Sequence, residues 1–325
     1  MNASATPARW GLTIPLDGVP LAEQRPIVES LPDLGFTDLW SSEANGADAF
    51  TPLALASVWA PGMHLGTAIV PVHTRGPGLM AMQAATLAAA APGRFSLGIG
   101  ASSPAIVRDW NAIPHEEPFK RSRDVLRFVR RALSGEMVDG EFDTFAIRRF
   151  RLGLVPETQP ELLLAALRPG MLRLAGREAD GTIINWLSAD DVPTVLREFA
   201  APEKTVVARI FVCPTEDAEH VRALGRRMIA AYLTVPAYAE FHRWLGREEI
   251  LKPLWENWAA GDRRTAAASI PDELVDQLIV HGSPEQVREG VQRYADNGVT
   301  VPVPALLPTP ADVSLTDAIR AVAPR

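Results

Sequence analysis

The 325-residue chain contains one cysteine, Cys213, so it cannot form a disulfide framework of its own. No apolar run approaches the ~20 residues that a membrane-spanning helix needs, since the alanine-rich stretch 81–92 is short and ends at a Pro-Gly pair. The beginning of the sequence has no basic segment followed by an apolar one, the pattern of a secretory leader. From these absences we expect a reduced, cytoplasmic protein that does not insert into a membrane.

An excess of positive charge is also missing. The chain has 32 Lys and Arg against 39 Asp and Glu, a formal net charge of −7, which opposes binding to a nucleic-acid backbone. Five arginines gather between 121 and 131, but their spacing distributes them around a helix that also carries apolar residues. We interpret this cluster as the solvated face of a helix and expect no nucleic-acid partner.

Several catalytic motifs are absent. The six histidines show no His-x-His or His-Glu-x-x-His spacing, so we expect no metal centre. No Gly-x-Ser-x-Gly occurs, and Cys213 lies inside an apolar run that is typical of a buried core residue. Gly98-Ile99-Gly100 lacks the third glycine and the later acidic residue of a dinucleotide-binding fingerprint. A Rossmann fold is therefore not supported.

What the chain does contain is a regular alternation of strand-like apolar runs with helical segments. This alternation indicates a parallel sheet or barrel with helical crossovers. Eight such units in roughly 250 residues or more are typical of a (β/α)8 TIM barrel, the α/β fold that we predict here as a single domain over 1–325. The predicted strands are Leu12–Leu16, Thr37–Ser41, His64–Val70, Phe95–Gly100, Leu162–Leu167, Gly181–Trp186, Val206–Cys213 and Val301–Leu307.

Two segments interrupt the alternation. Residues 135–160 alternate in polarity and turn at Asp139-Gly140, which predicts a short hairpin insertion. Residues 215–280 have a helical pattern rich in Trp and Arg and exceed the length of an ordinary crossover. We expect them to form a helical excursion that caps the mouth of the barrel or supports a homodimer.

Candidate functional groups lie in the loops that follow the strands, because these loops carry the chemistry in barrels of this kind. Glu43 is the one carboxylate directly after a strand end in this set, which makes it the predicted acid, base or hydrogen-bond acceptor. A loop cap or an ion pair is the structural alternative for the same residue. The polar candidates are Ser41, Ser42, Glu43, Asn45, His73, Thr74, Arg75, Ser102, Ser103, Arg168, Asn185 and Ser188.

The segment Leu167-Arg168-Pro169-Gly170-Met171 begins a helix directly after a predicted buried strand. Free backbone N–H groups and a guanidinium would face the same point, an arrangement that suits a phosphate. A plain strand-to-helix turn with Pro169 in its first helical turn is the alternative.

Five motifs distributed along the chain point to a family. They are GFTDLWSSE at 35–43, GTAIVP at 66–71 followed by Thr74-Arg75, PGRFSLGIG at 92–100, LRLAG at 172–176 with ADG at 179–181, and GSPEQV at 282–287. Together they resemble the luciferase-like monooxygenase superfamily, and within it the coenzyme F420-dependent oxidoreductases typical of actinobacteria. The resemblance spans most of the chain.

This resemblance implies a barrel in which the deazaflavin ring of coenzyme F420 lies over a bulge in the third strand. In the family the bulge often contains a non-prolyl cis peptide, which maps here to Ala68–Ile69. By the same mapping, the ring edge would meet Gly100, Ala101 and Ser102, and the phosphate would be held by Leu167, Arg168, Gly170 and Met171. Thr74, Arg75 and Asn185 complete the predicted cofactor-binding residues, with Arg75 assisting the anionic tail.

The chain departs from the sugar-phosphate dehydrogenase branch of the family, which has His, Glu and Lys where Ala44, Ser103 and Ser188 stand here. Glucose 6-phosphate oxidation is therefore not expected. We predict hydride transfer at C5 of the cofactor to or from a small organic substrate, with water or Glu43 handling the proton. The alternatives are a monooxygenase that uses reduced FMN and oxygen, and a non-catalytic flavin-binding barrel. Family habit favours a homodimer.

Overall fold

The computed structural model describes residues 9–324, and its centre is a parallel β-sheet. The strands pair in the order β1-β2-β3-β5-β8-β9-β10, and β12 pairs with β10 while also lying against β1, so the sheet curves round on itself. All eight predicted strands are present. The sheet contains β1 (Gly11–Thr13), β2 (Asp38–Ser41), β3 (His64–Thr67), β4 (Val70–Pro71), β5 (Phe95–Gly100), β8 (Glu161–Ala165), β9 (Gly181–Asn185), β10 (Thr205–Cys213), β11 (Ile279–His281) and β12 (Val301–Leu306).

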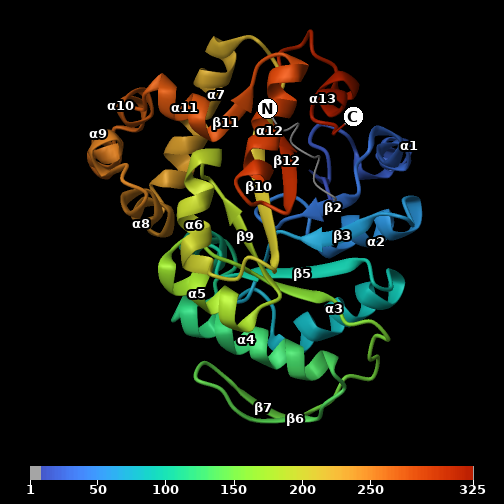
Figure 1. The fold of residues 1–325 in the computed structure, drawn as a ribbon. Helices are drawn as coiled ribbons and strands as arrows, with labels where there is room; N and C mark the ends of the chain where they lie inside the picture. Colours follow the sequence, from blue (N-terminus) through green and yellow to red (C-terminus); the bar gives the residue numbers. More distant parts are fainter. Residues whose placement is uncertain (1–8, 325) are drawn as a thin grey trace.

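Helices follow the strands in sequence and surround them in space (Figure 1). Most begin with a proline in the first turn, where its missing N–H costs no hydrogen bond. They are α1 (Arg25–Ser30), α2 (Phe50–Trp59), α3 (Pro77–Ala90), α4 (Pro118–Leu133), α5 (Pro169–Glu178), α6 (Val192–Phe199), α7 (Ala218–Leu233), α8 (Pro236–Trp244), α9 (Glu248–Ala259), α10 (Arg263–Ala268), α11 (Asp272–Leu278), α12 (Pro284–Asp296) and α13 (Leu315–Ala321). No helix among residues 9–324 is both long and apolar enough to span a membrane.

Some strand boundaries differ from the predicted ones, for local reasons. The third strand is divided into β3 and β4 at Ala68–Ile69. The sixth strand ends at Asn185 because Trp186 has a φ of +52°, which is incompatible with extended backbone. The first strand ends at Thr13, two residues before Pro15, which has no N–H to donate.

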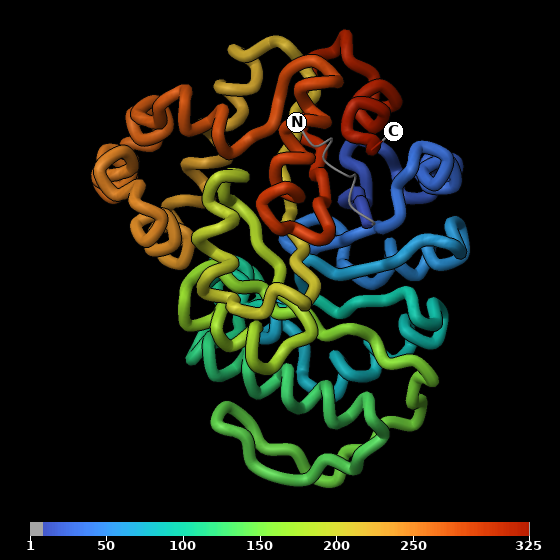
Figure 2. The backbone as a smooth tube through the Cα atoms, in the orientation of Figure 1, coloured from blue at the N-terminus to red at the C-terminus, as the bar shows by residue number. Residues whose placement is uncertain are grey.

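The segment between α4 and β8 contains two short strands outside the main sheet. The strands β6 (Val138–Glu141) and β7 (Ala146–Phe150) pair antiparallel. They lie along the outer side of α4, away from the parallel strands (Figure 2). Aromatic contacts hold them there, because the ring of Phe128 on α4 meets Phe142, Phe145 and Phe150 at centroid distances of 5.4–6.2 Å.

Residues 215–280 contain the predicted run of helices, α7 to α11, which projects to one side of the sheet (Figures 1 and 2). The helices end at Leu278, and Ile279–His281 form β11, which pairs with the last residues of β10. This run builds its own apolar cluster around Val221, Ile229, Leu254 and Leu274. It therefore packs as a layer against the ends of β9 and β10.

The interior of the curved sheet is a separate, smaller core. It contains Trp40, Leu163, Ile183, Val207, Val301 and Val303. Trp40 occupies so much of this space that a Cβ added at Gly66 would lie 2.3 Å from its ring. Because side chains alternate along a strand, the inward direction of Val207 also fixes that of Arg209 and Phe211 on β10.

Candidate active site

The third strand is interrupted where the family resemblance predicts a bulge. The Ala68–Ile69 peptide bond is cis, which confirms the prediction. Two backbone hydrogen bonds attach the bulge to the end of β2: Ala68 N–H donates to Ser41 O at 2.6 Å, and Glu43 N–H donates to Ile69 O at 3.2 Å. Ala68 and Ile69 are half-buried, whereas Thr67 and Val70 on either side are fully buried. The bulge is thus the accessible part of this strand.

Beside the bulge, β5 brings its backbone close to both neighbouring strands. A Cβ at Gly98 would lie 2.0 Å from Thr67 O, and Thr67 Oγ1 both donates to Gly98 O and accepts from Gly98 N–H. A Cβ at Gly100 would lie 3.0 Å from Ala165 Cβ and 3.3 Å from Ile69 Cδ1. Both glycines are buried, and their missing side chains let the strands, Ile69 and Ala165 pack into a close floor beside the bulge.

The loop after β5 continues this floor. Ala101 and Ser102 are half-buried, and Ser102 has a φ of +62°. Ala101 O accepts a hydrogen bond from His115 Nε2 at 3.2 Å. The ring of His115 lies 4.9 Å from that of His73, whose Nε2 contacts Glu116 O at 3.1 Å while its buried Nδ1 has no partner. Burial lowers the pKa of His73, so this imidazole is neutral near pH 7.

Glu43 and Arg75 form a bidentate ion pair beside the bulge, between the residues that follow β2 and those that follow β4. The Arg75 Nη1–Glu43 Oε2 and Arg75 Nη2–Glu43 Oε1 distances are both 2.5 Å, and the side chains are only 14% and 12% exposed. Ala49 N–H donates to Glu43 Oε1, and Arg75 Nε donates to Gln83. The ion-pair alternative for Glu43 is therefore present. An acid–base role for Glu43, and a cofactor-tail role for Arg75, remain predictions that require this pair to open.

The helix α5 begins at Pro169, four residues after the fifth barrel strand, β8, ends at Ala165. No side chain caps its first turn, so the N–H groups of Gly170 and Met171 are free of side-chain partners. Arg168 and Gly170 are exposed, and a Cβ at Gly170 would meet only Phe119, at 4.0 Å. Backbone donors, a free guanidinium and open space together fit a phosphate. Leu167 and Met171 are half-buried beneath this point.

Thr74 and Asn185, the remaining predicted cofactor residues, lie in different surroundings. Thr74 Oγ1 donates weakly to Pro71 O at 3.4 Å, at the end of β4. Asn185 ends β9 and accepts a hydrogen bond from Tyr238 Oη at 3.3 Å. It therefore lies with the helical excursion, next to Arg209 in the register of β10.

Trp186 is a packing residue. It is 1% exposed, and its ring lies 4.3 Å from Phe211 and 4.8 Å from Tyr232. Its carbonyl accepts a hydrogen bond from buried His242 Nε2 at 2.9 Å. Burial lowers the pKa of His242 to about 4, so a neutral imidazole joins α8 to the end of β9.

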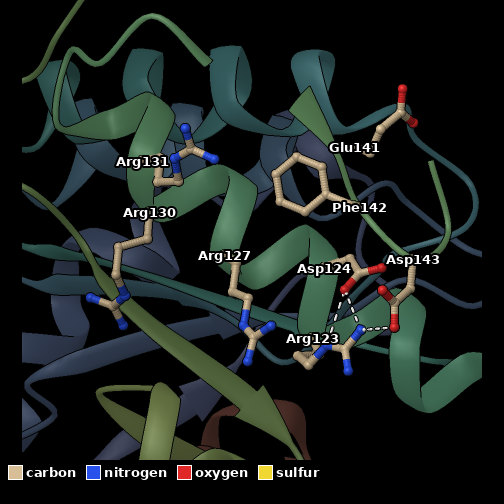
Figure 3. Close-up of a pocket in the computed structure, with 8 residues that line it drawn as sticks. All are labelled: Arg123, Asp124, Arg127, Arg130, Arg131, Glu141, Phe142 and Asp143. Atoms are coloured by element: carbon tan, nitrogen blue, oxygen red, sulfur yellow. Dashed lines mark hydrogen bonds and ion pairs between the residues drawn. The ribbon is translucent and has the colours of Figure 1, made fainter. Parts of the chain in front are cut away.

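The arginines of the α4 cluster other than Arg121 line a groove of about 410 Å³ between this helix and the β6–β7 pair (Figure 3). Its arginines are matched by carboxylates: Arg123 pairs with Asp124 and Asp143, and Arg127 pairs with Glu178. Arg130 and Arg131 pair with Asp180 and Glu136 in the same way. Because the charges are compensated within the fold, this groove offers no net positive surface.

Two functional candidates escaped the sequence reasoning. His115 lies in a loop without a recognisable pattern, and only the fold brings it to Ala101. Arg209 had a readable signal, since it is the single charged residue in the apolar run Thr205–Cys213. Among residues 9–324, no group of three His, Cys, Asp or Glu side chains is arranged to hold a metal ion.

Comparison with known proteins agrees with this architecture. A putative coenzyme F420-dependent oxidoreductase of Mycobacterium tuberculosis is 27% identical over 315 residues, covering 85% of this chain and 88% of that protein. A 5,10-methylenetetrahydromethanopterin reductase of Archaeoglobus fulgidus is 25% identical over 285 residues, with coverages of 82% and 84%. The solved structure of the coenzyme F420-dependent tetrahydromethanopterin reductase from Methanopyrus kandleri superimposes with a TM-score of 0.76 at 21% identity, over 97% of both chains.

These likenesses are consistent with the parallel strand order. The family model for luciferase-like monooxygenases matches residues 3–301, nearly the whole length of the sheet and its helices. The chain therefore belongs to the luciferase-like monooxygenase family.

Proposed function

We propose that the protein is a coenzyme F420-dependent oxidoreductase that transfers a hydride between C5 of the deazaflavin and a small organic substrate. The observation that carries this proposal is the accessible interruption of the third strand at Ala68–Ile69, which packs against the floor at Gly98 and Gly100. The names of the relatives from Mycobacterium tuberculosis and Archaeoglobus fulgidus support the cofactor and the reaction class.

The residues divide the work of binding between ring and tail. Ala68 and Ile69 would support one face of the ring, and Gly100, Ala101 and Ser102 would border its edge. The free N–H groups of Gly170 and Met171, with the guanidinium of Arg168, would hold the phosphate. When bound, the cofactor supplies or takes up two electrons and one hydrogen as a hydride.

Proton balance completes the reaction. In the reductive direction the substrate gains the hydride from reduced cofactor and one proton from solvent, and the oxidative direction returns both. We propose water as the proton partner in the resting arrangement, because both oxygens of Glu43 are bound by Arg75 and Ala49. Glu43 becomes a proton donor only if substrate or cofactor displaces Arg75.

The deciding experiment titrates the purified protein with coenzyme F420 and, separately, with FMN, following the quenching of tryptophan fluorescence. Micromolar or tighter binding of F420 alone supports the proposal. Preference for FMN, with oxygen consumption when FMN is reduced, would instead identify a monooxygenase of the same family. Binding of neither would leave a non-catalytic barrel as the better description.

We also propose a homodimer, cytoplasmic in location, with a small molecule as substrate. The outward faces of α2 and α3, which contact each other, expose Val58 (77%), Leu79 (50%) and Met82 (53%). Between 49 and 93 the one charged residue is Arg75, which is paired within the chain. An uncharged apolar face of this kind suits a second copy of itself. Multi-angle light scattering of the wild type and of Met82→Glu would test it, with a monomeric variant expected.

A further inference from the structure

Arg209 is a charged side chain without a charged or hydrogen-bonded partner in the described part of the chain. It lies in the middle of β10 and points inward, since it is two residues from Val207 in the interior core. It forms neither a hydrogen bond nor an ion pair, and its Nε is buried without a partner. The ring centroid of Phe211 lies 5.1 Å from its Cζ. The guanidinium is thus held in place with its donors unused.

Such an arrangement costs stability. A half-buried charge without a partner in the protein loses part of its hydration and gains no compensating bond. Burial lowers the pKa of Arg209, and only the more distant Tyr232, Tyr238 and Asp17 oppose that shift. Arginine nevertheless stays protonated in proteins, so the charge itself persists. A side chain that weakens the free protein in this way is expected to gain its partner from a ligand.

The surroundings of Arg209 define the shape of that ligand. Asn185 lies beside it in the register of β9, held by the hydrogen bond from Tyr238. Phe211, Trp186 and Tyr232 form a tilted series of rings with centroid distances of 4.3 and 4.8 Å, of which Tyr232 is half-buried and the other two are buried. One cation, one amide and one half-buried aromatic ring fit an anionic group attached to an apolar body.

The strand order fixes where Arg209 lies relative to the predicted cofactor-binding residues at the β3–β4 bulge. In an eight-membered order, β10 is the seventh strand and the β3–β4 bulge belongs to the third, so the two lie on opposite sides of the barrel. A molecule that contacts Arg209 therefore enters from the side facing the bulge. This is where a substrate would meet the exposed face of a ring supported by Ala68–Ile69.

We propose that Arg209 binds the carboxylate of the substrate, whose apolar or aromatic body lies beside Asn185 and the half-buried ring of Tyr232. This inference rests on the proposed function, because it assigns the substrate class of the same site. A carboxylate fits better than a phosphate, since one guanidinium neutralises a single charge through two parallel N–H···O bonds. A phosphate would bring a second negative charge, and the described residues place no second cation beside Arg209 to neutralise it.

The test measures binding of benzoate and of its neutral counterpart benzamide by isothermal titration calorimetry, without added cofactor. Wild type is expected to bind benzoate at least tenfold more tightly than benzamide. Arg209→Gln should remove this preference, and Arg209→Lys should retain part of it. Arg127→Gln, which breaks the surface pair with Glu178, is the matched control and should leave the preference unchanged.

A second variant separates recognition from folding. Arg209→Met keeps an unbranched, apolar stem and removes the unpartnered charge, so its melting temperature should be higher than that of the wild type while the benzoate preference is lost. A lower melting temperature would mean that Arg209 stabilises the fold, which overturns the proposal. Equal affinity of wild type for benzoate and benzamide overturns it as well.

The cofactor titration keeps the two proposals distinguishable. Arg209→Gln should bind F420 as tightly as the wild type, because the predicted phosphate loop lies elsewhere. If the variant loses F420 affinity but keeps its benzoate preference, Arg209 serves the cofactor and the substrate assignment fails. If wild type binds benzoate selectively but no F420, the carboxylate site stands and the proposed cofactor falls.

Discussion

The two halves of the barrel mouth are built by opposite means. On the side of β3, β5 and β8 the strands end in backbone, glycines and alanines, and the one carboxylate there, Glu43, is paired with Arg75. On the side of β9 and β10 the strands carry aromatic rings and a guanidinium that has no partner among the described residues. The first half is shaped by the absence of side chains and the second by their chemistry. A flat cofactor needs the former, and a substrate that must be recognised needs the latter.

Each half is also braced by one polar link to the surrounding elements. Glu43 and Arg75 join the end of β2 to the loop after β4, with a pair that is almost fully enclosed. His242 joins α8 to the end of β9 through the carbonyl of Trp186. The first link is ionic and the second neutral, so changes of charge and of pH should affect the halves differently.

The largest effect is expected from closing the space between β3 and β5. Gly98→Val would place a Cβ 2.0 Å from the carbonyl oxygen of Thr67, a backbone atom that cannot move without breaking the sheet. We expect a loss of at least about 4 kcal/mol of unfolding free energy, measured by urea denaturation. Gly62→Ala, where a Cβ meets nothing within 4 Å, should change stability by less than about 0.5 kcal/mol. Equal stabilities would contradict the close approach.

A smaller loss should follow from breaking the enclosed ion pair. Glu43→Gln leaves Arg75 charged, with its side chain 14% exposed, and should cost about 3 kcal/mol of unfolding free energy. The exposed pair Arg25–Glu29 serves as the control, and Glu29→Gln should cost less than about 0.5 kcal/mol. Turnover measured across pH separates the two roles of Glu43: an unchanged profile per folded molecule identifies a brace, and loss of one limb identifies a proton donor.

The hydrogen bond from His242 to the Trp186 carbonyl, on the side of β9 and β10, should stabilise the fold less in acid. The pKa of His242 is about 4 in the folded protein against 6.5 for the free side chain, so the unfolded chain binds the proton more readily. Stability from this group is complete above about pH 6.5 and is lost as pH falls toward 4, by about 2–3 kcal/mol in total.

His64 has a pKa lowered in the same way, so it would also destabilise the fold in acid. A variant of His242 is therefore needed to separate its contribution from that of His64. His242→Gln retains a donor for the Trp186 carbonyl but does not titrate. Urea denaturation at pH 7 and pH 4.5 should show a smaller loss on acidification for His242→Gln than for the wild type. His220→Gln, at an exposed position, should behave as the wild type does. Parallel losses in all three proteins would rule out His242 as the acid-sensitive brace.

How much of this structure the sequence predicts depends on whether a feature is set by residues close together in the chain or by contacts between distant segments. Apolar runs and turn residues are local signals, and they identified all eight strands of the barrel. The cis bulge and the α5 turn were also predictable, because they depend on short motifs that the family resemblance could map. Arg209 and His115 were not assigned, because their significance depends on what other segments place beside them. The missing partner of Arg209 is visible only once every neighbouring side chain is in position.

The smallest of these effects concerns the tail of the cofactor and leaves the fold intact. Gly170→Asp introduces a carboxylate at the first turn of α5, where it would compete with a phosphate for the free N–H groups and repel its charge. The affinity for F420 should fall about 30-fold, or roughly 2 kcal/mol, with an unchanged melting temperature. Gly170→Ala adds only a Cβ, 4.0 Å from Phe119, and should keep its affinity. Because Arg209 lies across the barrel, the benzoate preference should survive in Gly170→Asp. If both ligands weaken together, the two halves of the mouth are one site.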